Sequence, residues 1–336
     1  MSYEVVHLDK YYLRELVESI TLKDSLDQIS YTATVKITVP ASMQAINPAE
    51  LIRISGVPYG ESNWKPLLDP GVVWEVNSST DNIKTLDIII YDRTIYISKS
   101  EDEYLFPAGQ TASQRLRKYA ADWGMKLSTI PDTKTKLKKA VYRSQAIYNM
   151  ITADLQETVK AGGDMYIPRM TTTGLELFQI GSNKTVWVLK ATESVSRRRT
   201  LEGAITKVKV IGTEDRKETT RTKESGSKEE APSPILAIAT GETEKYGTLQ
   251  RMVQDEDVKT AAAGKKLAES MLTGIQETFT YTGIDINTLR AGDAVKLNGS
   301  ELIVTSISHT LGDPGHMNLE LASADYVKRR YFLKYG

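Results

Sequence analysis

One stretch of the sequence, residues 71–124, constrains the fold more than any other segment. At 86–90 apolar side chains recur at every second position, which is the pattern of a strand with one buried face. Thr111 precedes Gln114 by three residues, the spacing of a helix capping box, and Gly124 is placed to end that helix. The stretch therefore predicts a strand followed by a capped helix, and none of its residues suggests chemistry. The expected apolar face of the helix consists of Ala112, Leu116, Tyr119, Ala120 and Trp123.

The composition is that of a neutral globular chain. Its 336 residues include 43 basic and 43 acidic side chains, so no net charge attracts nucleic acid or anionic lipid. The chain has no cysteine, which excludes disulfides, a thiolate zinc site and a cysteine nucleophile. Charged residues near the start argue against a signal peptide, and no apolar run approaches the ~20 residues of a membrane helix. We therefore expect a soluble protein of two or three domains with no membrane partner.

The first half of the chain predicts a β domain interrupted by helices. Residues 33–39 alternate between apolar and polar side chains, as in a half-buried strand. Helical periodicity dominates from Thr111 onward, and we expect a second helix to start at Ser144 and to end before Gly162. Short strands follow, so the middle piece is a small α/β insertion within the first β domain.

Residues 213–234 break this pattern, because charges of both signs alternate there with Ser, Thr, Gly and Pro. Such a segment buries too little apolar surface to offset its ordering entropy, and it predicts a flexible linker. Beyond it we expect a helix capped by Asp255 or Asp257, and strands that include a hairpin turned by Asn298 and Gly299. The expected fold class is mainly β with an α+β insertion and two β-barrel or sandwich-like domains. The expected domains are a first β barrel at 1–108 plus 172–212, an inserted α/β domain at 109–171, the charged linker at 213–234, and a second β barrel with one helix at 235–336.

No cluster of residues predicts a catalytic centre. Asp24 with Asp27 and the acidic runs at 101–103 and 255–257 are candidate carboxylate pairs. Each lies in a polar or helix-capping context where we expect solvated carboxylates, whereas a glycosidase needs one carboxyl group in an apolar pocket. The sequence also lacks the G-x-S-x-G and H-E-x-x-H motifs. We predict no catalytic residue and no enzyme activity.

Metal, cofactor and nucleic-acid sites are not predicted either. His309, Asp313 and His316 match no standard metal-ligand spacing, so we expect the two histidines to be cross-strand neighbours. Basic residues at 134–143, 197–199 and 328–334 lack any accompanying nucleic-acid-binding signature, so no specific nucleic-acid partner is expected. The aromatic and basic segment 326–335 is instead the best candidate for a protein contact.

Several segments, in their order and spacing, resemble the XkdQ/YqbQ family, the tail hub proteins of PBSX-type defective prophages and of related contractile phage tails and bacteriocins. They are Tyr91-Asp92, YLFPAGQTAS at 104–113, WGM at 123–125, KVKVIG at 207–212, YGTLQ at 246–250, AGDAV at 291–295 and ISH at 307–309.

This resemblance implies a structural baseplate hub that forms a trimeric ring, in which three subunits with two β barrels each adapt a hexameric tail tube to a threefold spike. It implies as partners two further copies, the tail tube protein and the central spike or needle protein, and it allows a LysM-type tail protein and the tape-measure protein. The implied location is the tail or baseplate of a phage-like particle that assembles in the host cytoplasm. The alternative is a tail-associated cell-wall hydrolase.

Overall fold

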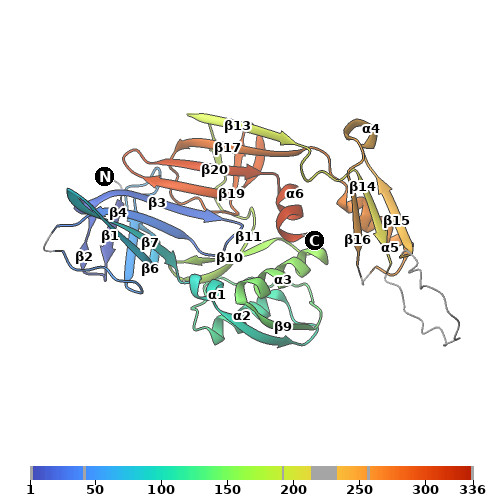
Figure 1. Cartoon of the computed structure of the whole chain (residues 1–336), viewed down its shortest axis with the longest axis horizontal. Helices are drawn as coiled ribbons and strands as arrows, with labels where there is room; N and C mark the ends of the chain where they lie inside the picture. Colours follow the sequence, from blue (N-terminus) through green and yellow to red (C-terminus); the bar gives the residue numbers. More distant parts are fainter. Residues whose placement is uncertain (1–2, 41–42, 191–192, 213–232, 256–257, 334–336) are drawn as a thin grey trace. The chain divides into compact units, whose positions relative to one another are not determined.

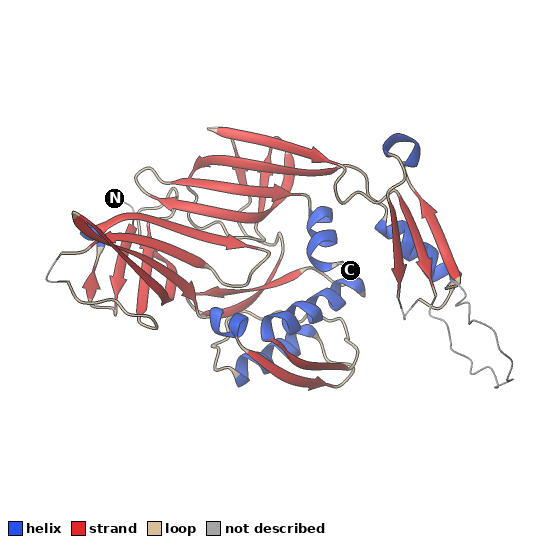
Figure 2. Cartoon of the chain, in the orientation of Figure 1, coloured by secondary structure: helices blue, strands red, loops and turns tan. Residues whose placement is uncertain are grey.

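The chain forms two units, which we describe separately (Figure 1). The computed structural model describes residues 3–40, 43–190, 193–212, 233–255 and 258–333. The larger unit comprises the described residues of 1–197 and 278–334, and the smaller unit those of 198–277. Strands predominate in the chain (Figure 2). This confirms the predicted fold class of a mainly β protein with an α+β insertion. No described helix is long and apolar enough to cross a membrane.

The larger unit is built around one sheet of 13 strands. These are β1 (Tyr3–His7), β2 (Tyr11–Tyr12), β3 (Val17–Ser25), β4 (Thr32–Thr38), β5 (Leu51–Gly56), β6 (Lys65–Asp81), β7 (Ile83–Asp92), β12 (Trp187–Leu189), β13 (Ser194–Thr200), β17 (Gln276–Ile284), β18 (Ala294–Leu297), β19 (Ser300–Leu311) and β20 (His316–Ala322). The hydrogen-bonded order is β13-β17-β20-β19-β3-β4-β7-β6-β5-β1-β2, with β18 joining β19 to β12. A short 3₁₀ helix, η1 (Arg14–Leu16), separates β2 from β3.

The alternating pattern predicted for β4 and β7 places their apolar residues opposite each other. Ala33, Val35 and Ile37 lie directly across from Ile90, Ile88 and Leu86 and are fully buried. Full burial of a Val, Leu or Ile side chain contributes about 1.5–3 kcal/mol, so this strand pair is a stable centre for the sheet. A second apolar core gathers around β17, β19 and β20. One continuous sheet thus contributes strands to two separate apolar cores.

The inserted part contains helices packed on two short ribbons. Its elements are α1 (Ile95–Lys99), β8 (Glu101–Phe106), α2 (Ala112–Asp122), β9 (Ala140–Ala146), α3 (Ile147–Lys160), β10 (Tyr166–Thr171) and β11 (Gly174–Gln179). The predicted capping box is confirmed, because the side chains of Thr111 and Gln114 each accept from the other's backbone N–H. The predicted helix start at Ser144 is wrong. Ser144 lies in β9 with a φ of 42°, and α3 begins at Ile147, where pairing with β8 has ended.

The C-terminal segment packs back onto this insertion. It forms α6 (Ala324–Val327) and a π-helical turn, η2 (Lys328–Phe332). Val327 and Phe332 are buried in the same apolar core as α2 and α3. The carbonyl of Tyr331 accepts from the side chain of Gln156 on α3 at 2.8 Å. Val327 and Phe332 therefore pack inside the chain and not on its surface.

The smaller unit is a three-stranded sheet with a helix on one face (Figure 2). Its elements are β14 (Lys207–Ile211), β15 (Ile235–Thr240), α4 (Thr243–Tyr246), β16 (Gln250–Gln254) and α5 (Ala261–Met271). Its strands come from both sides of the predicted linker, of which residues 213–232 lie outside the described residues. Thr260, and not Asp255, caps α5 by accepting from the N–H of Ala263, while Asp257 lies outside the described residues.

Candidate functional site

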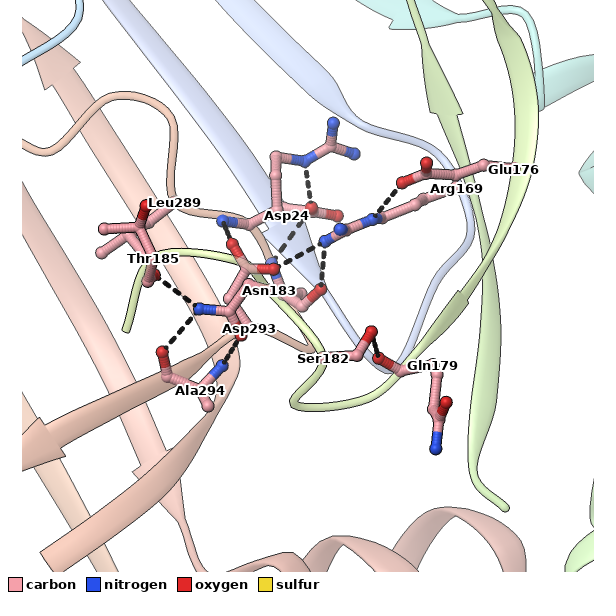
Figure 3. Close-up of polar contacts among 12 residues, drawn as sticks. Asp24, Arg169, Glu176, Gln179, Ser182, Asn183, Thr185, Leu289, Asp293 and Ala294 are labelled. Carbon is pink, nitrogen blue, oxygen red and sulfur yellow. Dashed lines mark hydrogen bonds and ion pairs between the residues drawn. The ribbon is translucent and has the colours of Figure 1, made fainter. Parts of the chain in front are cut away.

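A buried polar network surrounds the turn at residues 291–293, which we call the AGD turn (Figure 3). Gly292 adopts a φ of 92°, a conformation that only glycine tolerates readily. Its N–H donates to the carbonyl of Val304, and its carbonyl accepts from Gly181, both at 2.8 Å. The carboxylate of Asp293 accepts from the backbone N–H of Arg290 at 2.9 Å. Burial raises the pKa of Asp293, and the nearby Arg169 offsets part of that effect.

Arg169, on β10, fastens the β10–β11 hairpin to the AGD turn (Figure 3). Its Nη1 donates to Asp293 at 3.0 Å and its Nε donates to Glu176 at 2.8 Å. The guanidinium also lies 3.4 Å from the ring centroid of Phe178. The side chains of Arg169 and Asp293 are only 12% and 8% exposed, so these charged contacts are weakly screened by solvent.

Arg290 makes the corresponding connection to β3. Its Nε donates to the carboxylate of Asp24 at 2.5 Å, and the N–H of Ala291 donates to the same oxygen at 3.2 Å. The guanidinium stacks over the ring of Tyr31 at 3.9 Å, and its Nη1 donates to the carbonyl of Met170 at 3.3 Å. One arginine therefore ties together β3, β10 and the AGD turn.

Asp92 is the last residue of β7 and part of the Tyr91-Asp92 motif. Its side chain is almost fully buried and accepts from the backbone N–H of Tyr31 at 3.0 Å and of Thr94 at 2.8 Å. Burial raises the pKa of Asp92 to about 6, although the hydrogen bond from the Thr94 hydroxyl opposes the shift. The carboxylate thus satisfies two buried backbone donors where the strand pairing stops.

Asn183 fixes the segment before β12 to the start of β18 (Figure 3). Its Oδ1 accepts from the N–H of Ala294 at 2.6 Å, and its Nδ2 donates to the carbonyl of Ala294 at 2.9 Å. The same amide nitrogen donates to the carbonyl of Thr185 at 2.8 Å. The side chain therefore imitates a strand partner for the residue that follows the AGD turn.

A second buried ion pair lies inside the insertion, between α2 and α3. Arg115 Nη1 is 2.6 Å from Asp154 Oδ1, and the two side chains are 0% and 2% exposed. The hydroxyls of Tyr142 and Tyr119 also donate to Asp154, at 2.7 and 3.4 Å. Burial raises the pKa of Asp154, whereas the hydrogen bond from Tyr142 and the nearby Arg115 favour its charged form.

A cavity of about 210 Å³ adjoins the network and is large enough to hold several water molecules. Arg290, Asp92 and Tyr31 contribute to its wall, together with apolar residues such as Leu68 and Met170. The network carboxylates are already bonded to arginines or backbone N–H groups. In the part of the chain that the structure describes, no three His, Asp or Glu side chains are grouped to hold a metal ion. The arrangement suits the fixing of structural elements rather than acid–base chemistry.

The residues singled out from the sequence differ in burial and in their hydrogen-bond partners. Asp24, expected to be solvated, is buried against Arg290, whereas Asp27 is exposed. His309 and His316 lie on neighbouring strands, as predicted, with His316 paired to Thr310. His309 has its ring nitrogens 2.6 Å from Asp285 Oδ1 and 3.0 Å from the Leu289 carbonyl. His316 is 2.8 Å from Glu193. The acidic run at 101–103 is exposed on β8, and residues 256–257 lie outside the described residues.

The sequence interpretation missed the network itself. In the sequence, Asp92 and Asp293 stand out only as parts of family motifs, and Asn183 and Arg290 belong to no motif. Arg290 is separated by 266 residues from Asp24, so no local spacing could have connected them. The sequence does offer one signal for the network: the Tyr91-Asp92 and AGDAV motifs each contain an aspartate next to a strand end. The arginine triplet at 197–199 also proved to lie in a strand, β13.

A family of known proteins matches this sequence, and several solved structures have a similar fold. The YQBQ-like family model matches residues 68–322. No curated protein matches the sequence. The 43 kDa tail protein of prophage MuSo2 from Shewanella oneidensis has a similar structure, with a TM-score of 0.69, 13% identity, and coverage of 96% of this chain and 98% of that chain.

Two other solved structures are similar over nearly the same length. A tail protein from Neisseria meningitidis MC58 gives a TM-score of 0.65 at 12% identity, over 99% of this chain and 98% of that one. Prophage tail protein gp18 from Listeria monocytogenes gives 0.57 at 14% identity, again over 99% and 98%. At such identities the likeness establishes the fold. The family match, which covers most of the chain, confirms the resemblance seen in the sequence motifs. The chain therefore belongs to the YQBQ-like family and has the fold of phage tail proteins.

Proposed function

We propose that this protein is a structural hub of a contractile phage tail or phage-tail-like particle. Three copies would form a ring that adapts the hexameric tail tube to a threefold spike. The observation that carries the proposal is the end-to-end match with phage tail proteins, which leaves little of either chain unmatched. A protein that shares a whole fold with tail components, and not one detachable domain, is suited to the same architectural position.

The buried network supports this role because its contacts connect β3, the β10–β11 hairpin and the AGD turn. A hub must keep its shape under load while its surfaces bind neighbours. Arg169 and Arg290 hold these parts with charged hydrogen bonds that are largely shielded from water. In the proposal the network has this mechanical role, and the chain acts by binding its neighbours without enzyme activity.

The proposal is tested by reconstitution with a tail tube protein and a spike protein from the same phage-like particle. Electron microscopy of the mixture should show a threefold ring between tube and spike. Light scattering of the purified complex should give a hub mass of three chains. A hub that stays monomeric in the presence of both proteins would contradict the proposal. Clear lysis of purified cell wall by the chain alone would favour the hydrolase alternative.

A further inference from the structure

Two sheet faces carry exposed apolar side chains that no other described residue covers. The first is the face of the smaller unit that lies opposite α5, which we call the open face. In it Lys209 lies in register between Ile238 on β15 and Met252 on β16. Ile238 is 48% exposed and Met252 is 54% exposed. Lys207 lies two residues along the same strand and faces the same side, so the open face combines apolar and basic groups.

The second is the outer face of the two-stranded ribbon of β8 and β9, which we call the outer ribbon. Leu105 and Val141 are directly opposite each other and are 66% and 54% exposed. The inner face packs on the helices, where Tyr104 contacts the ring of Tyr119 with centroids 4.7 Å apart. The β8–β9 pair therefore has apolar side chains on both faces, and the described residues cover only the inner one.

The outer ribbon carries more acidic than basic side chains, with three carboxylates on β8 and the exposed Arg143 on β9, whereas the open face is basic. Glu101, Asp102 and Glu103 are exposed on β8, and among the described residues none of them forms an ion pair. An open groove of about 510 Å³ continues from them and is lined by Asp102, Glu103, Leu105 and Trp123. Lys118 and Asp122, which also line it, neutralise each other at 2.5 Å. The groove therefore keeps a negative charge beside an apolar surface.

We propose that the open face of one copy docks on the outer ribbon of the next copy in the ring. The two sheet faces would pack with Ile238 and Met252 against Leu105 and Val141, as stacked sheets do at a spacing of ~10 Å. Lys209 would meet the carboxylates of β8. Because the two surfaces differ, the contact is heterologous and repeats around a closed ring. This inference rests on the proposed ring.

The size of the open face determines how the contact behaves. Strands of about five residues at ~3.3 Å per residue, spaced ~4.8 Å apart, cover only a few hundred Å². A stable interface buries about 800 Å² on each partner. The contact is therefore weak between two free copies and becomes effective when ring closure and the other tail proteins raise the local concentration. A method that traps transient contacts is needed to detect it.

The absence of cysteine makes such a trap available. Ile238→Cys on one full-length chain and Leu105→Cys on a second, mass-tagged chain are mixed and oxidised at 50 mM salt. We expect a disulfide-linked heterodimer in at least fivefold excess over the control mixture. The control replaces Leu105→Cys by Val188→Cys, because Val188 on β12 is 65% exposed and lies on neither surface. Equal yields from the two mixtures would overturn the proposal.

Charge reversal then tests the recognition. Lys209→Glu in the Ile238→Cys chain should lower the yield about two- to fivefold, the effect of one exposed ion pair. Glu103→Lys in the Leu105→Cys chain should restore it, and raised salt should lower the yield of the original Ile238→Cys and Leu105→Cys mixture. A cross-linking yield that neither substitution changes would also overturn the proposal. Repeating the cross-link with the tube and spike proteins present separates the two proposals: rings without this disulfide refute the contact alone, and the disulfide without rings under those conditions refutes the hub.

Discussion

Asp24 and Asp27 are three residues apart and look equivalent in the sequence, yet the structure predicts very different costs for replacing them. Asp24→Ala removes the partner of Arg290, whose side chain is 15% exposed, and leaves the N–H of Ala291 without an acceptor. Breaking such a pair costs about 3–5 kcal/mol, because a buried charge is left uncompensated. Asp27→Ala removes a 3.6 Å surface pair with Arg330 and exposed hydrogen bonds from the hydroxyls of Tyr331 and Ser25, at 3.2 and 3.5 Å. Because these contacts are exposed to solvent, their loss costs about 1 kcal/mol.

Tryptophan fluorescence during urea unfolding measures this difference in the larger unit alone. All four tryptophans belong to it, at positions 64, 74, 123 and 187. With a slope of about 3 kcal/mol per M, a loss of about 4 kcal/mol lowers the urea midpoint by about 1.3 M. The Asp27→Ala midpoint should stay within about 0.3 M of wild type, at the same slope. Midpoints that agree for the two variants would refute the view that the Asp24–Arg290 pair holds the unit together.

Three further predictions concern other parts of the unit. Because the pKa of Asp92 is raised by burial to about 6, its contribution to the free energy of unfolding is present below the unfolded value near 3.8 and is lost as pH rises through 6. The stability of wild type minus that of Asp92→Asn should therefore fall between pH 4 and 7, and a pH-independent difference would contradict this. Arg115→Met or Asp154→Leu alone should cost about 3–5 kcal/mol in urea unfolding, whereas the double variant should recover most of that loss, and additive costs would argue against a coupled pair. Gly292→Ala should lower the thermal midpoint, because its Cβ would lie 2.7 Å from Ile167 at a positive φ, and an unchanged midpoint would show that the AGD turn can move.

Several elements were predictable from the sequence because neighbouring residues decide them. The alternation in β4 and β7, the capping box at Thr111 and the positive φ angles of Asn298 and Gly299 all follow from short-range sterics and hydrogen bonding. The start of α3 was not predictable in the same way. Ser144 is followed by helical periodicity, but pairing of β9 with β8 extends the strand to Ala146.

The sequence by itself determined which segments become strands and capped helices, and its motif order determined the family. Only the tertiary structure decided which acids are buried, because Asp24 finds Arg290 across 266 residues whereas Asp27 stays exposed. It also decided that β14 and β15, from either side of the predicted linker, pair in one small sheet. The physical reason is the same in each case. Periodicity reports how a segment meets water and apolar surface, whereas a charge or a strand edge is satisfied by whichever distant partner the whole fold brings to it.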